Sequence, residues 1–193
     1  MKIRILFIGN SHTYMHDLPA KVQALSAKDG YECEAVMLAH PNWYLHQHAE
    51  EPEARFNIKY GRYDYVVLQE HAHPFDRIEE YKEAARTLAG QIREAGATSV
   101  IFGTWAKKDD EEAQEAMNKV HRELAEEIKA LYAPVGEHWW TYMREHPELE
   151  LYEEDGAHAS ESGAGFAAGI IWETIRAHYA GNMKEEHEGK HEG

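Results

Sequence analysis

The sequence predicts an α/β domain in which a parallel β-sheet is covered by helices on both faces. Short apolar runs alternate along the chain with longer amphipathic segments, which is typical of strand–helix repeats. The strand candidates are apolar at consecutive positions, so both faces of each strand are expected to be buried between helical layers. A chain of 193 residues is long enough for one such domain with a full hydrophobic core.

Apolar runs predict the strands, at residues 3–8, 31–38, 63–69, 98–104 and 130–135. The first run ends at Gly9, and the fourth follows the turn residue Gly96. The runs at 31–38 and 130–135 are the weaker strand candidates. Together they predict a five-stranded sheet.

Amphipathic segments predict the helices, at residues 17–28, 78–95, 109–128 and 163–179. The segment 78–95 has the most regular stripe, with apolar residues every three or four positions from Ile78 to Ala95. The acidic run 109–112 precedes basic residues later in its helix, which suits the helix dipole and indicates a helix start rather than a metal site. Ser160 or Ser162 is the expected N-cap of the last helix.

The chain shows no internal repeat and no linker composition between these segments. Residues 1–180 are therefore predicted to form a single domain. The polar acidic stretch 181–193 is expected to be a flexible tail.

Charge and cysteine content exclude several classes of function. Lys and Arg total 20 and Asp and Glu total 35, which gives a formal net charge of −15. Such a field repels phosphate backbones and anionic lipids, so neither nucleic acid nor a membrane surface is an expected partner. A single cysteine, Cys33, rules out an internal disulfide framework and a Cys-rich zinc site. No signal-peptide or membrane-spanning pattern is visible, so we expect a cytoplasmic protein, with a homo-oligomer left open.

Chemistry-bearing residues follow the carboxyl ends of the predicted strands, where functional residues gather in parallel α/β folds. Ser11 comes directly after the first strand, behind Gly9, so its hydroxyl is expected at the sheet edge near free backbone N–H groups that could stabilise an oxyanion. A simple turn-capping role for Ser11 is the alternative. Before the last helix, Asp155 precedes His158 by three residues with Gly156 between them, a spacing at which the carboxylate can reach the imidazole and fix its tautomer.

With these residues the chain resembles the SGNH (GDSL-like) hydrolases, which are esterases and lipases. The resemblance is carried by the first-block Gly-Asn-Ser-x-Thr at residues 9–13, the third-block Val-Leu-Gln at 67–69, and Asp-x-x-His at 155–158, in the expected order. It implies a three-layer α/β/α sandwich with a flavodoxin-like five-stranded parallel sheet. It further implies that Ser11 is the nucleophile, that His158 is the general base and acid, and that Asp155 orients His158.

The resemblance also implies an oxyanion hole, in which this sequence departs from the family pattern. The Ser11 N–H is one expected donor. The second block usually supplies a glycine N–H, but here the stretch 39–43 contains Pro41, which has no N–H, so Asn42 is the expected substitute. The third block usually supplies an Asn side chain, and Gln69 carries the same amide with one more methylene. Asn10 stands where Asp is usual, at a position that is structural in the family.

Trp43 and Trp105 lie on the expected active-edge loops and are predicted, with Glu70, to line a substrate pocket. Ordinary packing is the alternative for the two aromatic rings, and a local structural role is the alternative for Glu70. The loops also contain several histidines that could bind a divalent metal, namely His40, His46, His48, His71 and His73. No carboxylate partner stands at a clear ligand spacing, so a wet, polar cleft is the favoured interpretation and no metal or other cofactor is expected.

These observations predict a hydrolase that cleaves a small ester through an acyl-enzyme on Ser11, with an acetylated carbohydrate as one candidate substrate. Two alternatives remain at this stage. One is a catalytically weak ligand-binding protein of the same fold, supported by the missing second-block glycine. The other is a metal-dependent hydrolase that uses the loop histidines.

Overall fold

A five-stranded parallel sheet forms the centre of the molecule, with strand order β2-β1-β3-β4-β5. The computed structural model describes residues 2–188. Its strands are β1 (Lys2–Gly9), β2 (Glu32–Ala39), β3 (Tyr65–Leu68), β4 (Thr98–Phe102) and β5 (Leu131–Ala133). Every pair of neighbouring strands is parallel, as the sequence predicted.

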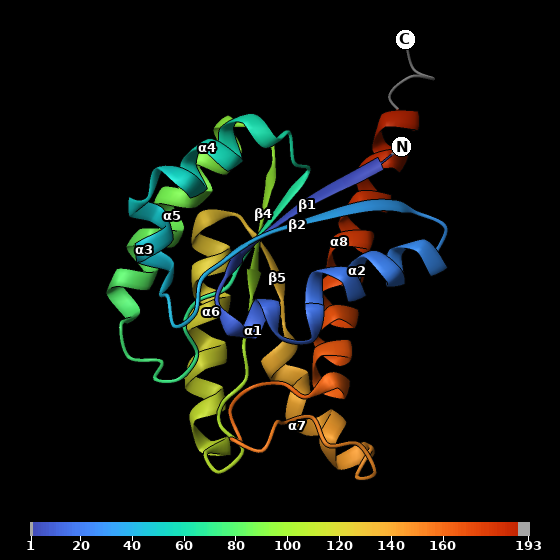
Figure 1. Cartoon of the computed structure of the whole chain (residues 1–193). Helices are drawn as coiled ribbons and strands as arrows, with labels where there is room; N and C mark the ends of the chain where they lie inside the picture. The colour runs from blue at the N-terminus through green and yellow to red at the C-terminus, as the bar shows by residue number, and fades with distance from the viewer. Residues whose placement is uncertain (1, 189–193) are drawn as a thin grey trace.

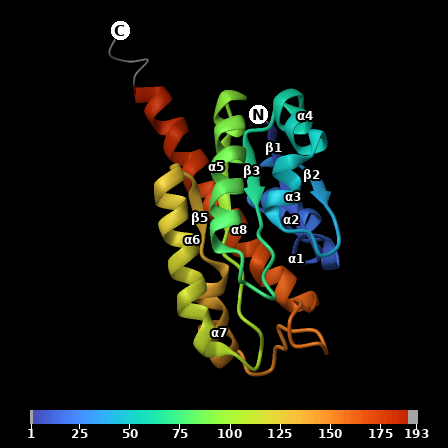
Figure 2. The same cartoon turned by 90° about the vertical axis from the view of Figure 1, so that its left-hand side faces the viewer.

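Helices cover both faces of this sheet (Figures 1 and 2). They are α1 (Ser11–Tyr14), α2 (Leu18–Lys28), α3 (Leu45–Glu50), α4 (Pro52–Gly61), α5 (Ile78–Glu94), α6 (Gln114–Ile128), α7 (Val135–Glu145) and α8 (Glu161–Glu188). Two 3-10 turns, η1 (Met15–Asp17) and η2 (Glu111–Ala113), precede α2 and α6. The predicted three-layer α/β/α sandwich is therefore confirmed.

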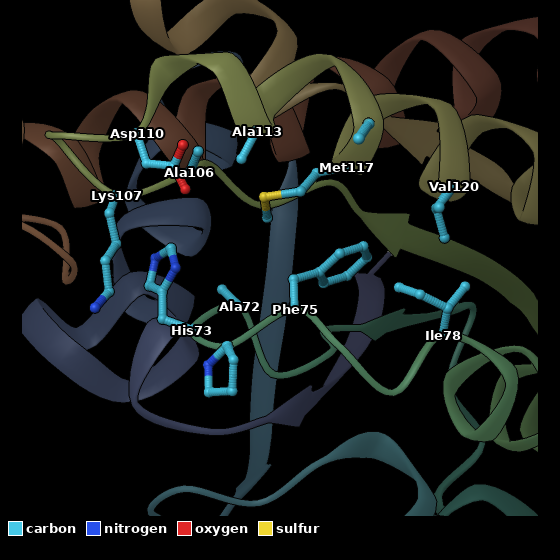
Figure 3. Close-up of a pocket in the computed structure, with 12 residues that line it drawn as sticks. Ala72, His73, Phe75, Ile78, Ala106, Lys107, Asp110, Ala113, Met117 and Val120 are labelled. Carbon is cyan, nitrogen blue, oxygen red and sulfur yellow. The ribbon is translucent and has the colours of Figure 1, made fainter.

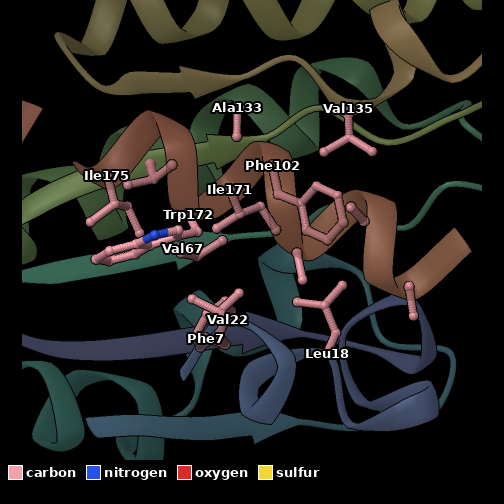
Figure 4. Packing of buried hydrophobic residues seen from close by; sticks show 14 of the residues in the cluster. Phe7, Leu18, Val22, Val67, Phe102, Ala133, Val135, Ile171, Trp172 and Ile175 are labelled. Atoms are coloured by element: carbon pink, nitrogen blue, oxygen red, sulfur yellow. The ribbon is translucent and has the colours of Figure 1, made fainter. Parts of the chain in front are cut away.

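Alternate residues of β1 enter two separate cores, because successive side chains of a strand point to opposite faces. Ile3, Ile5 and Phe7 pack toward α2 and α8, in the cluster drawn in Figure 4. Leu6 and Ile8 pack toward α3, α4, α5 and α6 on the other face. All five side chains are fully buried, which explains why the run is apolar at consecutive positions.

Some predicted boundaries are wrong, and several short elements were not predicted. The helix expected from residue 109 begins as η2 at Glu111 and becomes α6 only at Gln114, because residues 107–110 form a turn closed by the Asp110 N–H and the Lys107 carbonyl. The last helix runs to Glu188 rather than to residue 179. The predicted tail therefore begins inside α8, and residues 189–193 lie outside the described part of the chain.

The helices that were not predicted are α1, α3, α4 and α7. The first three are short, and α4 is separated from α3 by Pro52, which occupies its first turn. None of the helices within residues 2–188 combines the length and the apolar character needed to cross a membrane.

Candidate active site

Ser11 is the first residue of α1 and directly follows the end of β1. Asn10 caps this helix, since its side-chain oxygen accepts a hydrogen bond from the His12 N–H at 3.1 Å. The Asn10 side-chain nitrogen donates to the Trp43 carbonyl at 2.9 Å, which ties the turn to the loop after β2. The Ser11 N–H makes no hydrogen bond to any described residue, so it is free to bind a ligand atom.

Gln69 holds this turn from the end of β3. Its Oε1 accepts from the Asn10 N–H at 2.8 Å and from the Thr13 hydroxyl at 2.9 Å. A backbone N–H can only donate, so the amide oxygen must face Asn10 and the amide nitrogen must face away, where it donates to the Glu70 carbonyl. Gln69 is buried and therefore anchors the nucleophile turn, while its predicted role as an oxyanion donor stays a prediction.

Asp155 and His158 lie together on a tight hairpin, residues 152–159, before α8. Tyr152 pairs with Ala159 at the base, and the Glu153 N–H donates to the His158 carbonyl at 2.9 Å. Asp155 Oδ1 accepts from the N–H groups of Ala157 and His158, each at 2.9 Å, and Oδ2 lies 2.5 Å from His158 Nδ1.

These contacts keep the Asp155 carboxyl ionised. Burial opposes the charge, but the hydrogen bonds from the His158 ring and from the two N–H groups outweigh it and lower the pKa of the carboxyl well below its ordinary value. A carboxylate accepts the proton of Nδ1, which leaves Nε2 of a neutral imidazole without a proton.

The structure brings this imidazole to Ser11, which lies 147 positions earlier in the sequence. His158 Nε2 lies 2.8 Å from Ser11 Oγ, so the serine hydroxyl can donate to the ring. The three side chains therefore form one chain of hydrogen bonds, from Asp155 through His158 to Ser11, of the kind that activates a serine nucleophile.

Asn42 occupies the third position of a turn over residues 40–43, closed by the Trp43 N–H and the His40 carbonyl at 3.3 Å. Pro41 precedes Asn42, and Asn42 has a left-handed φ of 60°, a combination typical of a type II turn. Within residues 2–188 no acceptor is hydrogen-bonded to the Asn42 N–H. Because the Asn10 side chain holds the Trp43 carbonyl, this turn lies beside the nucleophile turn.

Of the predicted pocket residues, Trp43 alone is partly exposed, with its ring against His40 at 4.1 Å. Trp105 is fully buried and stacks on Trp139 at 4.0 Å, and its Nε1–H donates to the Ala157 carbonyl at 2.9 Å. The expectation that Trp105 lines an open pocket is therefore wrong. It supports the hairpin that carries His158.

Glu70 is also buried rather than exposed to a pocket. Its carboxyl accepts from the Leu45 N–H at 3.1 Å, which joins the end of β3 to the start of α3. Burial raises the pKa of Glu70 to about 7, although hydrogen bonds from the backbone of His71 and Leu45 oppose the shift. The local structural role, left open in the sequence, is the one that the geometry favours.

Solved structures similar to this one include hydrolases and esterases. A proposed SGNH hydrolase from Slackia heliotrinireducens matches with a TM-score of 0.79 and 26% identity, over 91% of this chain and 100% of that chain. An acetyl xylan esterase matches with a TM-score of 0.74 and 14% identity, over 90% of this chain and 100% of that chain. The chain has the SGNH hydrolase fold.

A catalytic mutant of an acetylxylan esterase from Geobacillus stearothermophilus shares this SGNH fold, with a TM-score of 0.70 and 15% identity over 90% of this chain and 94% of that chain. The sequence itself matches no protein-family model and no curated protein. The similarity is therefore carried by the three-dimensional structure.

His12 is a residue of this candidate site that the sequence analysis missed. It is 7% exposed, and its ring lies 4.9 Å from that of His158 and 5.2 Å from that of His73. Burial lowers the pKa of His12 well below its ordinary value and lowers that of His73 to about 4, so both rings are neutral at pH 7. The position of His12 directly after Ser11 was the one available signal.

A cavity of about 550 Å³ opens beside His73, between the loop after β3 and helix α6. Figure 3 shows Phe75, Ile78, Met117 and Val120 around one end of it and His73, Lys107 and Asp110 grouped at the other. Its size is that of a small-molecule site, and most of its lining is apolar. His73 links it, through His12, to the Ser11–His158 pair.

The loop histidines that could have bound a metal are separately engaged. His48 Nε2 donates to the Gly9 carbonyl at 2.8 Å, and the His71 ring stacks on Tyr44 at 4.2 Å. Among residues 2–188, no group of three or more His, Cys, Asp or Glu side chains is placed to hold a metal ion. Within residues 2–188, the metal-dependent alternative therefore has no set of side chains that could serve as ligands.

Proposed function

We propose that this protein is a serine hydrolase of the SGNH type that cleaves a small ester through an acyl-enzyme on Ser11. One observation carries the proposal: Ser11 Oγ lies 2.8 Å from His158 Nε2, while the other nitrogen of that ring lies 2.5 Å from Asp155 Oδ2. A serine that merely caps a turn needs neither contact. The names of the similar structures, which include hydrolases and esterases, support the same reaction class.

In the first half of the reaction, Ser11 Oγ attacks the ester carbonyl carbon and its proton moves to His158 Nε2. The tetrahedral intermediate then collapses, the bond to the alcohol oxygen breaks, and His158 gives its proton to the leaving alcohol. In the second half, a water molecule gives a proton to His158 and attacks the acyl carbon. The carboxylic acid leaves as Ser11 Oγ takes the proton back, so no cofactor is consumed.

The oxyanion of both intermediates needs donors that are already in place. The free N–H groups of Ser11 and Asn42 are the proposed backbone donors. Gln69 is the third candidate, and it would donate only after its amide nitrogen turns from the Glu70 carbonyl toward the site. Loss of one donor lowers the rate by about 10²–10³-fold. If the Asn42 N–H does not replace that of the usual glycine, the enzyme is therefore slower but catalyses the same reaction.

For the substrate we propose a small ester, with acetyl groups on a carbohydrate as the first class to test. The proposal is supported by the acetyl xylan esterases among the similar structures. Trp43, partly exposed beside the nucleophile turn, offers an aromatic surface for a sugar ring. The apolar cavity beside His73 could also hold an acyl group longer than acetyl.

The test is intact mass after treatment with a fluorophosphonate probe. The wild type is expected to gain one adduct, the Ser11→Ala variant none, and the control Ser162→Ala, at an exposed position on α8, the same adduct as the wild type. A folded wild type that gains no adduct would exclude an activated serine and leave the ligand-binding alternative. Ester cleavage that survives Ser11→Ala but stops with a chelator would instead establish a metal-dependent reaction.

A further inference from the structure

His16 joins the segment that carries Ser11 to the hairpin that carries His158. It lies in η1, five residues after Ser11, and its Nε2 is 2.6 Å from Glu153 Oε1. Its Nδ1 is 3.1 Å from Glu161 Oε2, at the start of α8. The contact with Glu153 is a hydrogen bond, in which a ring N–H donates to the carboxylate, and Glu161 lies at ion-pair distance from the other nitrogen. We call His16, Glu153 and Glu161 the His16 clasp.

The His16–Glu153 contact is better protected than an ordinary surface ion pair, whereas the Glu161 side chain is 72% exposed. The side chains of His16 and Glu153 are 26% and 35% exposed, so solvent screens their contact only in part. Lys21 of α2 also pairs with Glu161 and so ties α2 to the same network.

Glu153 transmits this contact directly to His158. The two residues face each other across the hairpin, where the Glu153 N–H donates to the His158 carbonyl at 2.9 Å. On the other side, Ser11 and His16 belong to one short continuous segment formed by α1 and η1. Holding His16 against Glu153 therefore limits how far the hairpin can move away from Ser11.

The backbone at His16 supports a functional reason for the contact. His16 and Asp17 have φ of 53° and 49°, two consecutive left-handed residues that are not glycine. This conformation is rare because the Cβ crowds the following carbonyl. Asp17 has a local reason for it, since its side chain caps α2 by accepting from the Ala20 N–H at 3.3 Å. His16 has no cap to make, and strain that surrounding contacts maintain is concentrated at functional sites.

We propose that His16 is a positioning residue, which sets the distance between Ser11 Oγ and His158 Nε2 by holding Glu153. This inference rests on the proposed function, because the distance matters only if Ser11 is the nucleophile. A displacement of about 1 Å in a reacting pair can lower a rate by about 10²-fold. The hydrogen bond at 2.8 Å leaves little room for such a displacement.

The test compares His16→Asn, Glu153→Ala and Glu153→Gln. Asn accepts a left-handed backbone but is too short to replace the imidazole. We expect His16→Asn and Glu153→Ala each to lower the fluorophosphonate labelling rate and kcat by about tenfold or more, with KM unchanged. The double variant should be no worse than either single one, since both remove the same contact. Glu153→Gln keeps an accepting oxygen and should retain most of the rate.

The matched control is His146→Asn, at the end of α7, where His146 Nδ1 lies 3.5 Å from Glu148 in an exposed pair. It should change neither labelling nor kcat. A second readout is deuterium uptake by the amides of residues 153–158, which should be faster in His16→Asn and unchanged in His146→Asn.

The possible outcomes separate this inference from the proposed function. Unchanged labelling in His16→Asn and Glu153→Ala overturns the positioning role and leaves the serine hydrolase standing. Reduced labelling with unchanged deuterium uptake, or an equal loss in His146→Asn, also overturns it, because the hairpin would not be the cause. A wild type that fails to label at all overturns the proposed function, and the positioning role with it.

Discussion

Replacing Gly9 by alanine is expected to damage both the stability of the protein and the nucleophile turn. Gly9 is the last residue of β1. A Cβ at this position would lie 2.4 Å from Gln69 Oε1 and 2.4 Å from Thr13 Oγ1, about 1 Å inside ordinary contact. Neither atom is free to move, because Gln69 Oε1 already binds both the Asn10 N–H and the Thr13 hydroxyl.

The cost has two parts. Forcing a methyl group into a packed interior costs about 1–3 kcal/mol. The methyl group also pushes Gln69 Oε1 aside, so the buried Asn10 N–H loses its acceptor, at a further cost of about 1–3 kcal/mol. The expected loss of unfolding free energy is therefore about 2–6 kcal/mol, a large part of the about 5–15 kcal/mol that a typical domain has.

Urea denaturation measures this loss, and the rate of fluorophosphonate labelling reports on Ser11 in the protein that remains folded. The control is Gly165→Ala on α8, where the same methyl group would meet open space and should raise stability by about 0.5–1 kcal/mol. A Gly9→Ala variant within about 0.5 kcal/mol of the wild type, with an unchanged labelling rate, would refute the reasoning.

Three further predictions concern the groups around the site. Asp155→Asn should lower kcat/KM by about 10³–10⁴-fold, because an amide no longer fixes the imidazole tautomer, and a loss below about tenfold in ester hydrolysis would contradict this role. Trp105→Phe should lower the labelling rate because it removes the hydrogen bond to the Ala157 carbonyl, whereas Trp140→Phe, whose Nε1 lies 3.2 Å from a side-chain oxygen, should leave that rate unchanged. For Glu70, the folded pKa of about 7 exceeds the ordinary 4.5, so the folded state binds the extra proton between these values and stability falls by up to about 3 kcal/mol as pH rises from about 4.5 to 7. Glu70→Gln should abolish that slope in urea denaturation at several pH values, and an unchanged slope would assign it to another group.

The sheet could be predicted because its strands are buried on both faces. Ile5, Leu6, Phe7 and Ile8 have no exposed surface, so no polar residue interrupts the run, and the same holds for Val66 and Leu68 in β3. The short helices were not predictable in the same way. α7 buries only Val135, Gly136 and Trp139, too few positions to show a helical period against the preceding strand.

For the site, the sequence predicted which residues follow the carboxyl ends of the strands, but it did not predict which of them are buried against the helices. Ser11 and His158 are 147 positions apart in the sequence, and they meet at 2.8 Å because β1, which ends at the nucleophile turn, lies inside the sheet between β2 and β3. Trp105 was misassigned because a tryptophan that follows a strand can either line the site or pack in the core beneath it, and the sequence pattern is the same in both cases. Burial decides between the two, and burial depends on α7, which the sequence did not show.

Two histidines, the buried His12 and the partly buried His73, lie beside the His158 hairpin, where apolar side chains would be expected in a core. Both ring nitrogens of His12, and Nε2 of His73, are buried without a hydrogen-bond partner among residues 2–188. Each such group costs about 1–3 kcal/mol, and apolar side chains of similar volume would avoid the cost. Since burial keeps both rings neutral, they add no positive charge beside His158. In the proposed reaction a protonated neighbour there would oppose the imidazolium formed on His158. A stability cost accepted next to the Ser11–His158 pair therefore marks this corner as a functional site, since a core that served only stability would be apolar here.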